Sequence, residues 1–489
     1  MVDQISKEKI ERWFPFIVLV SIFIFLYIFF SKIHPIVIFD QDDWDYISNY
    51  RKPFPLWGAW NPTRVLPEIL MPLAGYFAAY IVTPLVGDYV LAVTITSALI
   101  VAFGISSYYL IFKVFLTETW NINCIQIILV SLFFILAHFG LFRSLNENNA
   151  YMFWANDLTC YYFYLIPSLI NAGLVLYLMK TKNFFACFQT MSNLKKGTIG
   201  LMFYLALFSN LFSSGILGVY CIVKLVISRN TSNWQEVKFY RIIFGLWIFV
   251  LLFEANGKDA AKVGGAYSYL HLPLGDTFSA FLGLARTMDW SYVGLLVICL
   301  VGSIWVYKCV KLHDEVENTY KTIMSEISFC LILMFIFLLL LCAKVTPSYA
   351  GRGDVTFGFF FYVLLLIFNA GSYLLRRTSN ANILLPFVLL VFVVIGTNPC
   401  SPFKESNYSP YECMAVSRNF ISQARESEGK GQHIFVLKVP KGSADLNWPH
   451  PPSYFGNILA RTLSAHGLVK HKIKINVQVD PEMNKIFYK

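Results

Sequence analysis

The sequence predicts an all-α polytopic membrane bundle of about 11 transmembrane helices, followed by a small extracytoplasmic α/β domain. Of the 489 residues, 57% are hydrophobic and only 14% are charged. Soluble domains carry about 25% charged residues, so this composition excludes a soluble protein of this length. The apolar residues are also gathered into stretches of about 20, the length that crosses the hydrocarbon core of a bilayer.

The first apolar stretch covers residues 14–33 and has no small-residue cleavage site behind it, so we interpret it as a retained anchor and not as a signal peptide. Similar stretches predict single crossings further along the chain, at 89–112, 123–142, 158–179, 240–255, 291–309, 325–343, 355–375 and 382–398. Together with two short helices expected within 197–228, they give eleven crossings.

Two segments do not fit a single ordinary crossing. Residues 197–228 are too long, and the polar and small residues between Ser209 and Gly215 interrupt them, which predicts two short helices that meet at a turn. Residues 66–86 contain Glu68 and three prolines, so we expect a helix that lies along the membrane surface and leave it out of the count.

Lys and Arg residues beside the predicted spans set the orientation, because cytoplasmic loops carry an excess of both. In an eleven-span count the basic clusters fall on one side, from Lys7, Lys9 and Arg12 before the first span to Arg376 and Arg377 near the last. The N-terminus is therefore expected in the cytoplasm, and topology explains the formal charge of +10 without nucleic-acid binding. No Walker, GxGxxG, HExxH or paired CxxC motif indicates ATP-driven transport, dinucleotide chemistry or structural zinc.

This orientation divides the chain into two parts. Residues 1–398 are expected to form the membrane domain, with a first extracytoplasmic loop at 34–88, and residues 399–489 the exported C-terminal domain. The C-terminal domain shows two strand patterns and one helix pattern, at 433–439, 472–479 and 454–465. Cys400 and Cys413 fall in this part, where an oxidising compartment permits a disulfide between them; two free thiols are the alternative.

Four aspartates follow the first span within the run FDQDDWDY: Asp40, Asp42, Asp43 and Asp45. Adjacent carboxylates such as Asp42 and Asp43 repel each other when both ionise, so one holds a raised pKa or a nearby cation stabilises both. Either state suits a general base that removes a proton from a hydroxyl. The alternative is a solvated acidic turn that ends the helix.

This arrangement resembles a known family. An acidic pair at the exit of the first span, followed by aromatic residues and a membrane-parallel helix that carries Arg64, is similar to the integral-membrane GT-C glycosyltransferases. The segment NAYMFWANDLTCYYFYLIPSLI (149–170) resembles the Trp-then-Tyr loop and span of the bacterial branch that decorates O-antigen, in particular the Gtr-type serotype-converting glucosyltransferases.

The resemblance implies a reaction and its place. Glucose would pass from undecaprenyl-phosphate-glucose to a hydroxyl of a lipid-linked O-antigen sugar, with inversion, on the periplasmic face of the bacterial inner membrane. By position, Asp42 or Asp43 would be the catalytic base. Asp40 also fits, because it follows His34-Pro35 and a few apolar residues as in some branches of the family, so the choice among the three stays open.

The donor class also follows from the site's location, because sugar nucleotides are soluble anions made in the cytoplasm and a site outside needs a lipid-linked donor. Arg64 at the start of the expected surface helix can clamp its phosphate in two-point fashion, although an Arg that snorkels to lipid headgroups is the alternative. A divalent metal is compatible with this chemistry but not required, and no other cofactor is implied. Further phosphate-binding candidates on the exported side are Lys258, Lys262, Arg286, Lys344 and Arg352.

Aromatic and polar residues of the exported loops complete the candidate site. Trp57, Trp60, Trp154 and Tyr161 are candidates for stacking on sugar rings, while Glu147, Asp157, His271, Asp276 and Asp45 are candidates for substrate contacts. Aromatic residues at a membrane interface need no substrate to explain them, which is the alternative for the first group.

Two other functions fit a chain of this kind. A transporter or flippase of lipid-linked sugars predicts charged residues within spans and two similar halves, and the sequence shows few of the former and no clear repeat. An O-antigen polymerase predicts a large Arg-rich exported loop between later spans. The longest internal exported regions here are the first loop and 256–290.

Overall fold

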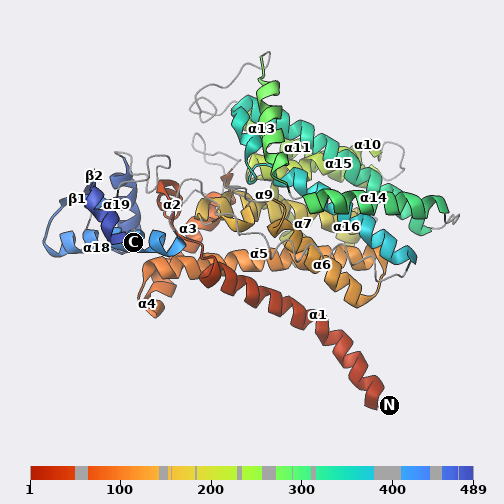
Figure 1. Cartoon of the computed structure of the whole chain (residues 1–489), viewed down its shortest axis with the longest axis horizontal. Helices are drawn as coiled ribbons and strands as arrows, with labels where there is room; N and C mark the ends of the chain where they lie inside the picture. The colour runs from red at the N-terminus through yellow and green to blue at the C-terminus, as the bar shows by residue number, and fades with distance from the viewer. Residues whose placement is uncertain are drawn as a thin grey trace.

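Long helices lie side by side along the long axis of the molecule (Figure 1). The computed structural model describes residues 2–49, 64–142, 152–155, 157–181, 184–227, 234–255, 271–288, 290–309, 315–378, 409–440, 454–471 and 473–487. Among these residues, six helical segments are long and apolar enough to cross a membrane: Trp13–Ile33, Pro67–Val86, Tyr89–Trp120, Cys160–Lys180, Val316–Val345 and Phe357–Thr378. The predicted helical membrane bundle is confirmed to this extent.

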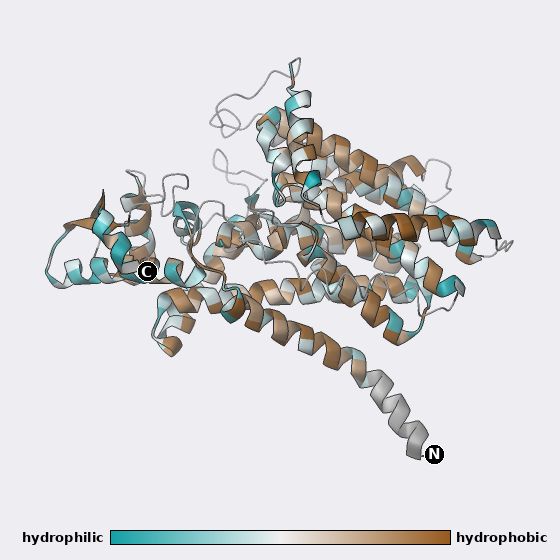
Figure 2. Ribbon diagram, viewed as in Figure 1, coloured by the Kyte–Doolittle hydropathy of each residue, from teal (hydrophilic) through white to brown (hydrophobic). Residues whose placement is uncertain are grey.

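The spans differ in how far the rest of the chain covers them. Five of the six are built from α1 (Val2–Ile28) with η1 (Phe29–Ile33), α5 (Tyr89–Trp120), η5 (Cys160–Leu165) with α7 (Ile166–Lys180), α15 (Glu315–Val345) and α16 (Phe357–Thr378). The apolar window of α16 is 94% buried, whereas that of α1 is 22% buried. Figure 2 shows α1 as a largely apolar helix, so α16 lies in the core of the bundle and α1 is left for lipid to cover.

The predicted break within 197–228 is confirmed. Helices α9 (Asn193–Leu207) and α10 (Leu211–Ile227) meet at an angle of 119°. The break has a local cause, because Ser209 Oγ donates to the carbonyl oxygen of Ala206 at 2.6 Å and Asn210 Oδ1 accepts from the backbone nitrogen of Phe212 at 2.9 Å. These bonds end one helix and begin the next, as short polar side chains do at helix termini.

Three further predicted crossings are helical but are not among these six segments. They are α6 (Cys124–Phe139), α11 (Trp234–Ala255) and α14 (Trp290–Cys309). The predicted crossing at 382–398 lies outside the described residues. The count of eleven crossings therefore stays a prediction.

The segment predicted to lie along the membrane surface is a continuous helix made of α3 (Pro67–Phe77), η3 (Ala78–Val82) and α4 (Thr83–Val86). Its length and composition qualify it as a span, which the sequence analysis did not expect. Pro67 stands in the first turn of α3, where a missing N–H costs no hydrogen bond. The segment lies at the end of the bundle that carries the C-terminal residues (Figure 1).

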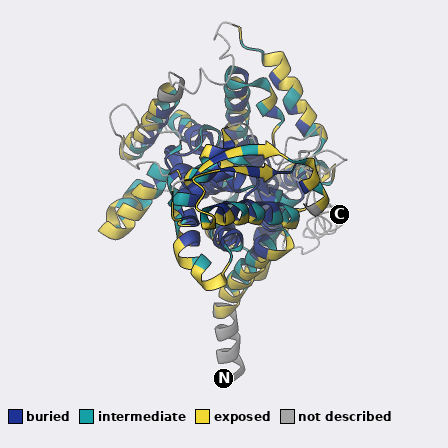
Figure 3. Cartoon of the chain, turned by 90° about the vertical axis from the view of Figure 1, so that its left-hand side faces the viewer, coloured by how far each residue is buried: buried dark blue, intermediate teal, exposed yellow. Residues whose placement is uncertain are grey.

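The described residues of the C-terminal part, 409–440, 454–471 and 473–487, contain the predicted strands and helix, and we call them the C-terminal unit. It contains α18 (Pro410–Gly429), β1 (Ile434–Val439), α19 (Phe455–Ala465), β2 (Lys474–Val479), η9 (Pro481–Met483) and α20 (Asn484–Phe487). The two strands pair in parallel, from Ile434 opposite Lys474 to Val439 opposite Val479. Figure 3 views the molecule from this end, where buried and exposed residues alternate along β1.

The helix α18 was not predicted from the sequence, although a helix-capping pattern marks its start. Ser409 and Glu412 form a capping box, in which Ser409 Oγ accepts from the backbone nitrogen of Glu412 and the Glu412 carboxylate accepts from that of Ser409. A Ser followed three residues later by Glu is the sequence pattern of this cap. The helix α19 packs closely against β2 at Gly456. A Cβ atom at this position would lie 2.0 Å from the Ile475 carbonyl oxygen.

Candidate active site

The acidic run after the first span folds into the short helix α2 (Gln41–Tyr46), and Asp40 is its N-cap. Oδ1 of Asp40 accepts from the backbone nitrogens of Asp42 at 2.9 Å and Asp43 at 3.1 Å. An N-cap carboxylate satisfies amides that have no partner within the helix. Both bonds use Oδ1, so the cap does not engage the second oxygen of Asp40.

Asp43 is fully buried and holds two distant parts of the chain together. Its Oδ2 accepts from the backbone nitrogens of Phe39 at 2.8 Å and Leu158 at 3.1 Å. Its Oδ1 accepts from the backbone nitrogen of Thr159 at 2.7 Å and from the Thr159 hydroxyl at 2.6 Å. Burial raises the pKa of Asp43, followed by the charge of Asp157, while the four donors favour its ionised form. A structural role fits this carboxylate better than proton abstraction.

Asp157 lies beside the acidic run, because Val37 and Asp157 form a parallel β-bridge. Its Oδ2 accepts from the backbone nitrogen of Cys160 at 2.9 Å, which caps the start of that span. Burial, and then the negative charge of Asp40, raise the pKa of Asp157 to about 7. Burial and the neighbouring Asp43 and Asp42 likewise raise the pKa of Asp40 well above its usual value.

Asp40 and Asp157 are therefore two half-buried carboxylates that disfavour each other's ionisation. Such pairs keep one group protonated near neutral pH, where it can accept or return a proton. From the sequence, Asp157 was predicted only to contact substrate, and not to act together with Asp40. No spacing rule connects the two residues, because the β-bridge that joins them is a tertiary contact.

Asp42 is exposed on α2. Partial desolvation and then the charge of Asp45 raise the pKa of Asp42, and the positive charge of Arg64 lowers it. Arg64 thus acts electrostatically on the acidic run, and its role in phosphate binding stays a prediction. Asp45 itself forms an ion pair with Arg461 of α19.

A second cation, Arg352, lies near the carboxylates. It follows η7 (Pro347–Gly351) and binds Asp354 in two-point fashion, with Nε to Oδ1 at 3.1 Å and Nη2 to Oδ2 at 2.5 Å. Its guanidinium stands 5.0 Å from the ring centre of Tyr349 and 5.6 Å from that of Tyr164. Asp354 also contributes to the raised pKa of Asp157, so this charged pair belongs to the same site.

The other predicted residues are less closely connected. Trp154 donates from Nε1 to the Phe139 carbonyl oxygen at 2.6 Å, and its own carbonyl oxygen accepts from His34 Nε2 at 2.7 Å, so its packing alone accounts for its position. Arg286 is exposed at the last turn of α13 (Leu274–Arg286). Five predicted residues lie outside the described residues: Trp57, Trp60, Glu147, Lys258 and Lys262.

The predicted disulfide stays a prediction. Cys413 is a buried free thiol on α18, and burial raises its pKa. Cys400 lies outside the described residues. Among the residues that the structure describes, no three His, Cys, Asp or Glu side chains form a group that could hold a metal ion.

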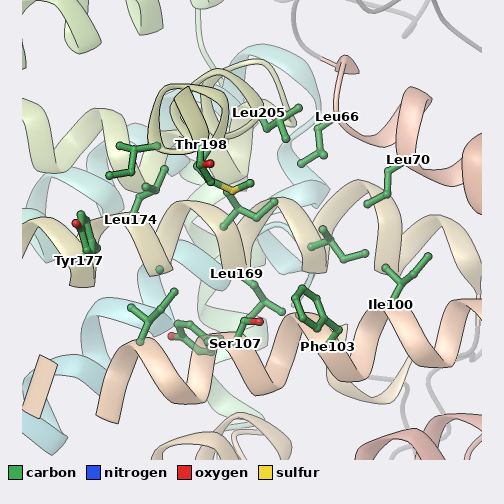
Figure 4. A pocket seen from close by; sticks show the side chains of 18 of the residues that line it. Leu66, Leu70, Ile100, Phe103, Ser107, Leu169, Leu174, Tyr177, Thr198 and Leu205 are labelled. Atoms are coloured by element: carbon green, nitrogen blue, oxygen red, sulfur yellow. The ribbon is translucent and has the colours of Figure 1, made fainter. Parts of the chain in front are cut away.

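A large apolar groove lies among the membrane helices. It has a volume of about 940 Å³ and is lined by side chains of α5, α7 and α9 together with Leu66 and Leu70 at the start of α3. Figure 4 shows Leu66 and Leu70 near one end of the groove and Tyr177 at the other. Leu66 is two residues after Arg64, and its backbone nitrogen donates to the Phe208 carbonyl oxygen at 3.0 Å. One end of the groove therefore lies at a residue two positions along the chain from Arg64.

The fold and the site together define a polytopic helical membrane protein with an acidic site at one end of the bundle. No protein family, curated protein or solved structure matches the chain significantly.

Proposed function

We propose that this chain is a membrane glycosyltransferase of the GT-C type. Its expected reaction is the transfer of glucose from undecaprenyl-phosphate-glucose to a hydroxyl of lipid-linked O-antigen, on the periplasmic face of the bacterial inner membrane. The observation that carries the proposal is the apolar groove lined at one end by Leu66, which is two residues after Arg64 in the chain. A long apolar groove with a cation at one end suits a ligand with a polyprenyl tail and a phosphate head.

The carboxylates suit the other half of the reaction. In a single displacement, Asp40 takes the proton of the acceptor hydroxyl while the hydroxyl oxygen forms a bond to the anomeric carbon of the donor sugar. The bond between that carbon and the phosphate oxygen breaks, and polyprenyl phosphate leaves with the electron pair. Burial and then the charges of Asp43 and Asp42 raise the basicity of Asp40, and the carboxylate of Asp157 lies beside it. Arg64 and Arg352 neutralise the departing phosphate. This route inverts the anomeric configuration.

A flippase of lipid-linked sugars is the second candidate, because one observation favours it. Lys224 of α10 and Glu326 of α15 form an ion pair at 2.8 Å between two membrane helices, with the Glu326 side chain only 6% exposed. Ionisable residues inside membrane helices often mark transport pathways. The pair lies in the helices of the bundle and not beside the carboxylates, so it offers the acidic site no role. No comparable observation in the described residues favours a polymerase.

A comparison of donors and of outcomes separates these functions. Purified protein in nanodiscs is incubated with O-antigen on its lipid carrier and with either undecaprenyl-phosphate-glucose or UDP-glucose. We expect the acceptor to gain the mass of one hexose with the lipid-linked donor and not with the nucleotide. In proteoliposomes, movement of a labelled polyprenyl-phosphate sugar across the bilayer without any change in acceptor mass would identify a flippase instead.

A further inference from the structure

The helix α2, which carries the acidic run, is clamped between two parts of the chain. On one side, Asp43 binds the segment that begins the Cys160 span. On the other side lies α19 of the C-terminal unit. A helix of six residues is not stable on its own, so its neighbours determine its orientation.

The contacts with α19 extend along the whole of α2. Gln41 Nε2 donates to the Tyr454 hydroxyl at 3.0 Å, just before α19 begins. Near the end of α2, Arg461 pairs with the Asp45 carboxylate and also donates to the Asp45 carbonyl oxygen at 3.2 Å. The spacing of these positions on α2 is that of one helix face.

Thr462 of α19 contacts the end of α2 and the residue Ser48 just beyond it. Its hydroxyl donates to the Trp44 carbonyl oxygen at 2.5 Å and lies 2.7 Å from the Ser48 hydroxyl. Thr462 is fully buried, so these bonds are shielded from water. Buried hydrogen bonds of this kind cost more to lose than exposed ones.

The helix α19 is itself firmly held. Leu459 and Leu463 are fully buried, and Gly456 allows α19 to approach β2 at backbone distance. Arg461 and Thr462 therefore project from a fixed element onto α2. A displacement of α19 would therefore also displace α2, the helix that follows Asp40.

We propose that α19 is a positioning element of the reaction, with Arg461 and Thr462 as positioning residues that fix the orientation of α2. This inference rests on the proposed function for its effect on rate, but its structural part is independent of it. The C-terminal unit then serves catalysis without supplying a group that touches the reacting atoms. A misplacement of about 1 Å in a catalytic group costs up to about 100-fold in rate.

The chain offers a closely matched control. Arg418 of α18 pairs with Asp88 at 2.7 Å, and it also links the C-terminal unit to the membrane helices. Its side chain is 44% exposed and that of Arg461 is 45% exposed, while the two aspartates are both 28% exposed. The two ion pairs differ in that Arg461 holds α2, whereas Arg418 holds the start of α5.

Arg461→Ala and Arg418→Ala are compared by steady-state kinetics and by amide hydrogen exchange in nanodiscs. For Arg461→Ala we expect kcat to fall by about 10- to 100-fold with the KM for the lipid donor unchanged, and exchange within 41–48 to accelerate while β1 and β2 keep their protection. Arg461→Lys should recover part of the loss. Arg418→Ala should change neither kcat nor the hydrogen exchange within 41–48.

Thr462 provides a second pair of variants. Thr462→Ser keeps the hydroxyl, whereas Thr462→Val keeps the shape and leaves the Trp44 carbonyl oxygen without its donor. Only Thr462→Val should accelerate exchange within 41–48 and lower kcat. Unchanged exchange in both Arg461→Ala and Thr462→Val would overturn the proposal. A wild-type protein without transferase activity in which these variants still loosen 41–48 would refute the proposed reaction and leave the positioning contact intact.

Discussion

Thr159 donates two hydrogen bonds to Asp43, from its backbone nitrogen at 2.7 Å and from its hydroxyl at 2.6 Å. This contact joins the loop after the first span to the start of the Cys160 span. It also brings Asp157, two residues before Thr159, next to the cap of α2 at Asp40. The buried carboxylate of Asp43 thus holds Asp40 and Asp157 in place.

We expect changes at this contact to reduce stability. Thr159→Val removes one donor to a buried charged group and should cost about 1.5 to 3 kcal/mol, whereas Thr159→Ser should cost less because the hydroxyl stays. Asp43→Asn turns one acceptor oxygen into a donor that faces the chain's own N–H or O–H groups and should destabilise at least as much. Thermal unfolding in detergent checks the order. An Asp43→Asn protein as stable as the wild type would contradict the anchoring role.

Asp40→Asn should leave the fold intact and abolish transfer. Asn is as good an N-cap as Asp, so α2 keeps its start, but the base is lost, which typically costs about 100- to 10,000-fold in rate. Asp480→Asn is the control, since Asp480 is the N-cap of η9, where it accepts from the backbone nitrogen of Glu482, and lies outside the site. Initial rates and melting temperatures of both variants are compared with those of the wild type. Normal transfer by Asp40→Asn would exclude this residue as the base.

The pH dependence of kcat/KM should show an acidic limb. A base works only when ionised, so the rate should rise with pH as the Asp40 and Asp157 pair loses a proton, and the pKa of about 7 at Asp157 places this step near neutral pH. Asp157→Asn removes a negative neighbour, which favours ionised Asp40 and lowers its pKa. The acidic limb should then move to lower pH. A limb that stays in place would show that the two carboxylates are not coupled.

The apolar groove predicts a variant that distinguishes donors by tail length. Gly104 lines the groove, and a Cβ atom there meets only Leu169 Cδ1 at 3.6 Å within 4 Å, so Gly104→Leu should extend into the groove without a clash at Cβ. KM should rise for the undecaprenyl donor and change little for a donor with a short prenyl chain. Gly245→Leu is the control, because Gly245 of α11 is exposed, has open space around it and does not line the groove. Equal effects of Gly104→Leu on both donors would argue against tail binding here.

Local sequence patterns predicted much of the architecture. Hydropathy placed the long helices, the polar run near Ser209 predicted the break between α9 and α10, and alternation predicted β1 and β2. These features depend on residues that are neighbours in the chain. The acidic run was likewise visible, because its members lie within six positions.

The roles within the acidic run could not be predicted in this way. Asp42 and Asp43 look alike in sequence, yet one is exposed and the other is buried under four donors. The difference is made by Leu158 and Thr159, which are far away along the chain. The ion pair between Arg461 and Asp45 also joins residues that are far apart along the chain. Such contacts arise from tertiary packing, and no local periodicity encodes them.

The central claim is that Asp40 removes a proton from an acceptor hydroxyl that receives sugar from a lipid-linked donor. The most direct measurement is mass spectrometry of lipid-linked O-antigen after incubation with undecaprenyl-phosphate-glucose and either wild-type, Asp40→Asn or Asp480→Asn protein. We expect a gain of one hexose with the wild type and with Asp480→Asn, and none with Asp40→Asn. The same gain with all three proteins, or with none of them, would contradict the account.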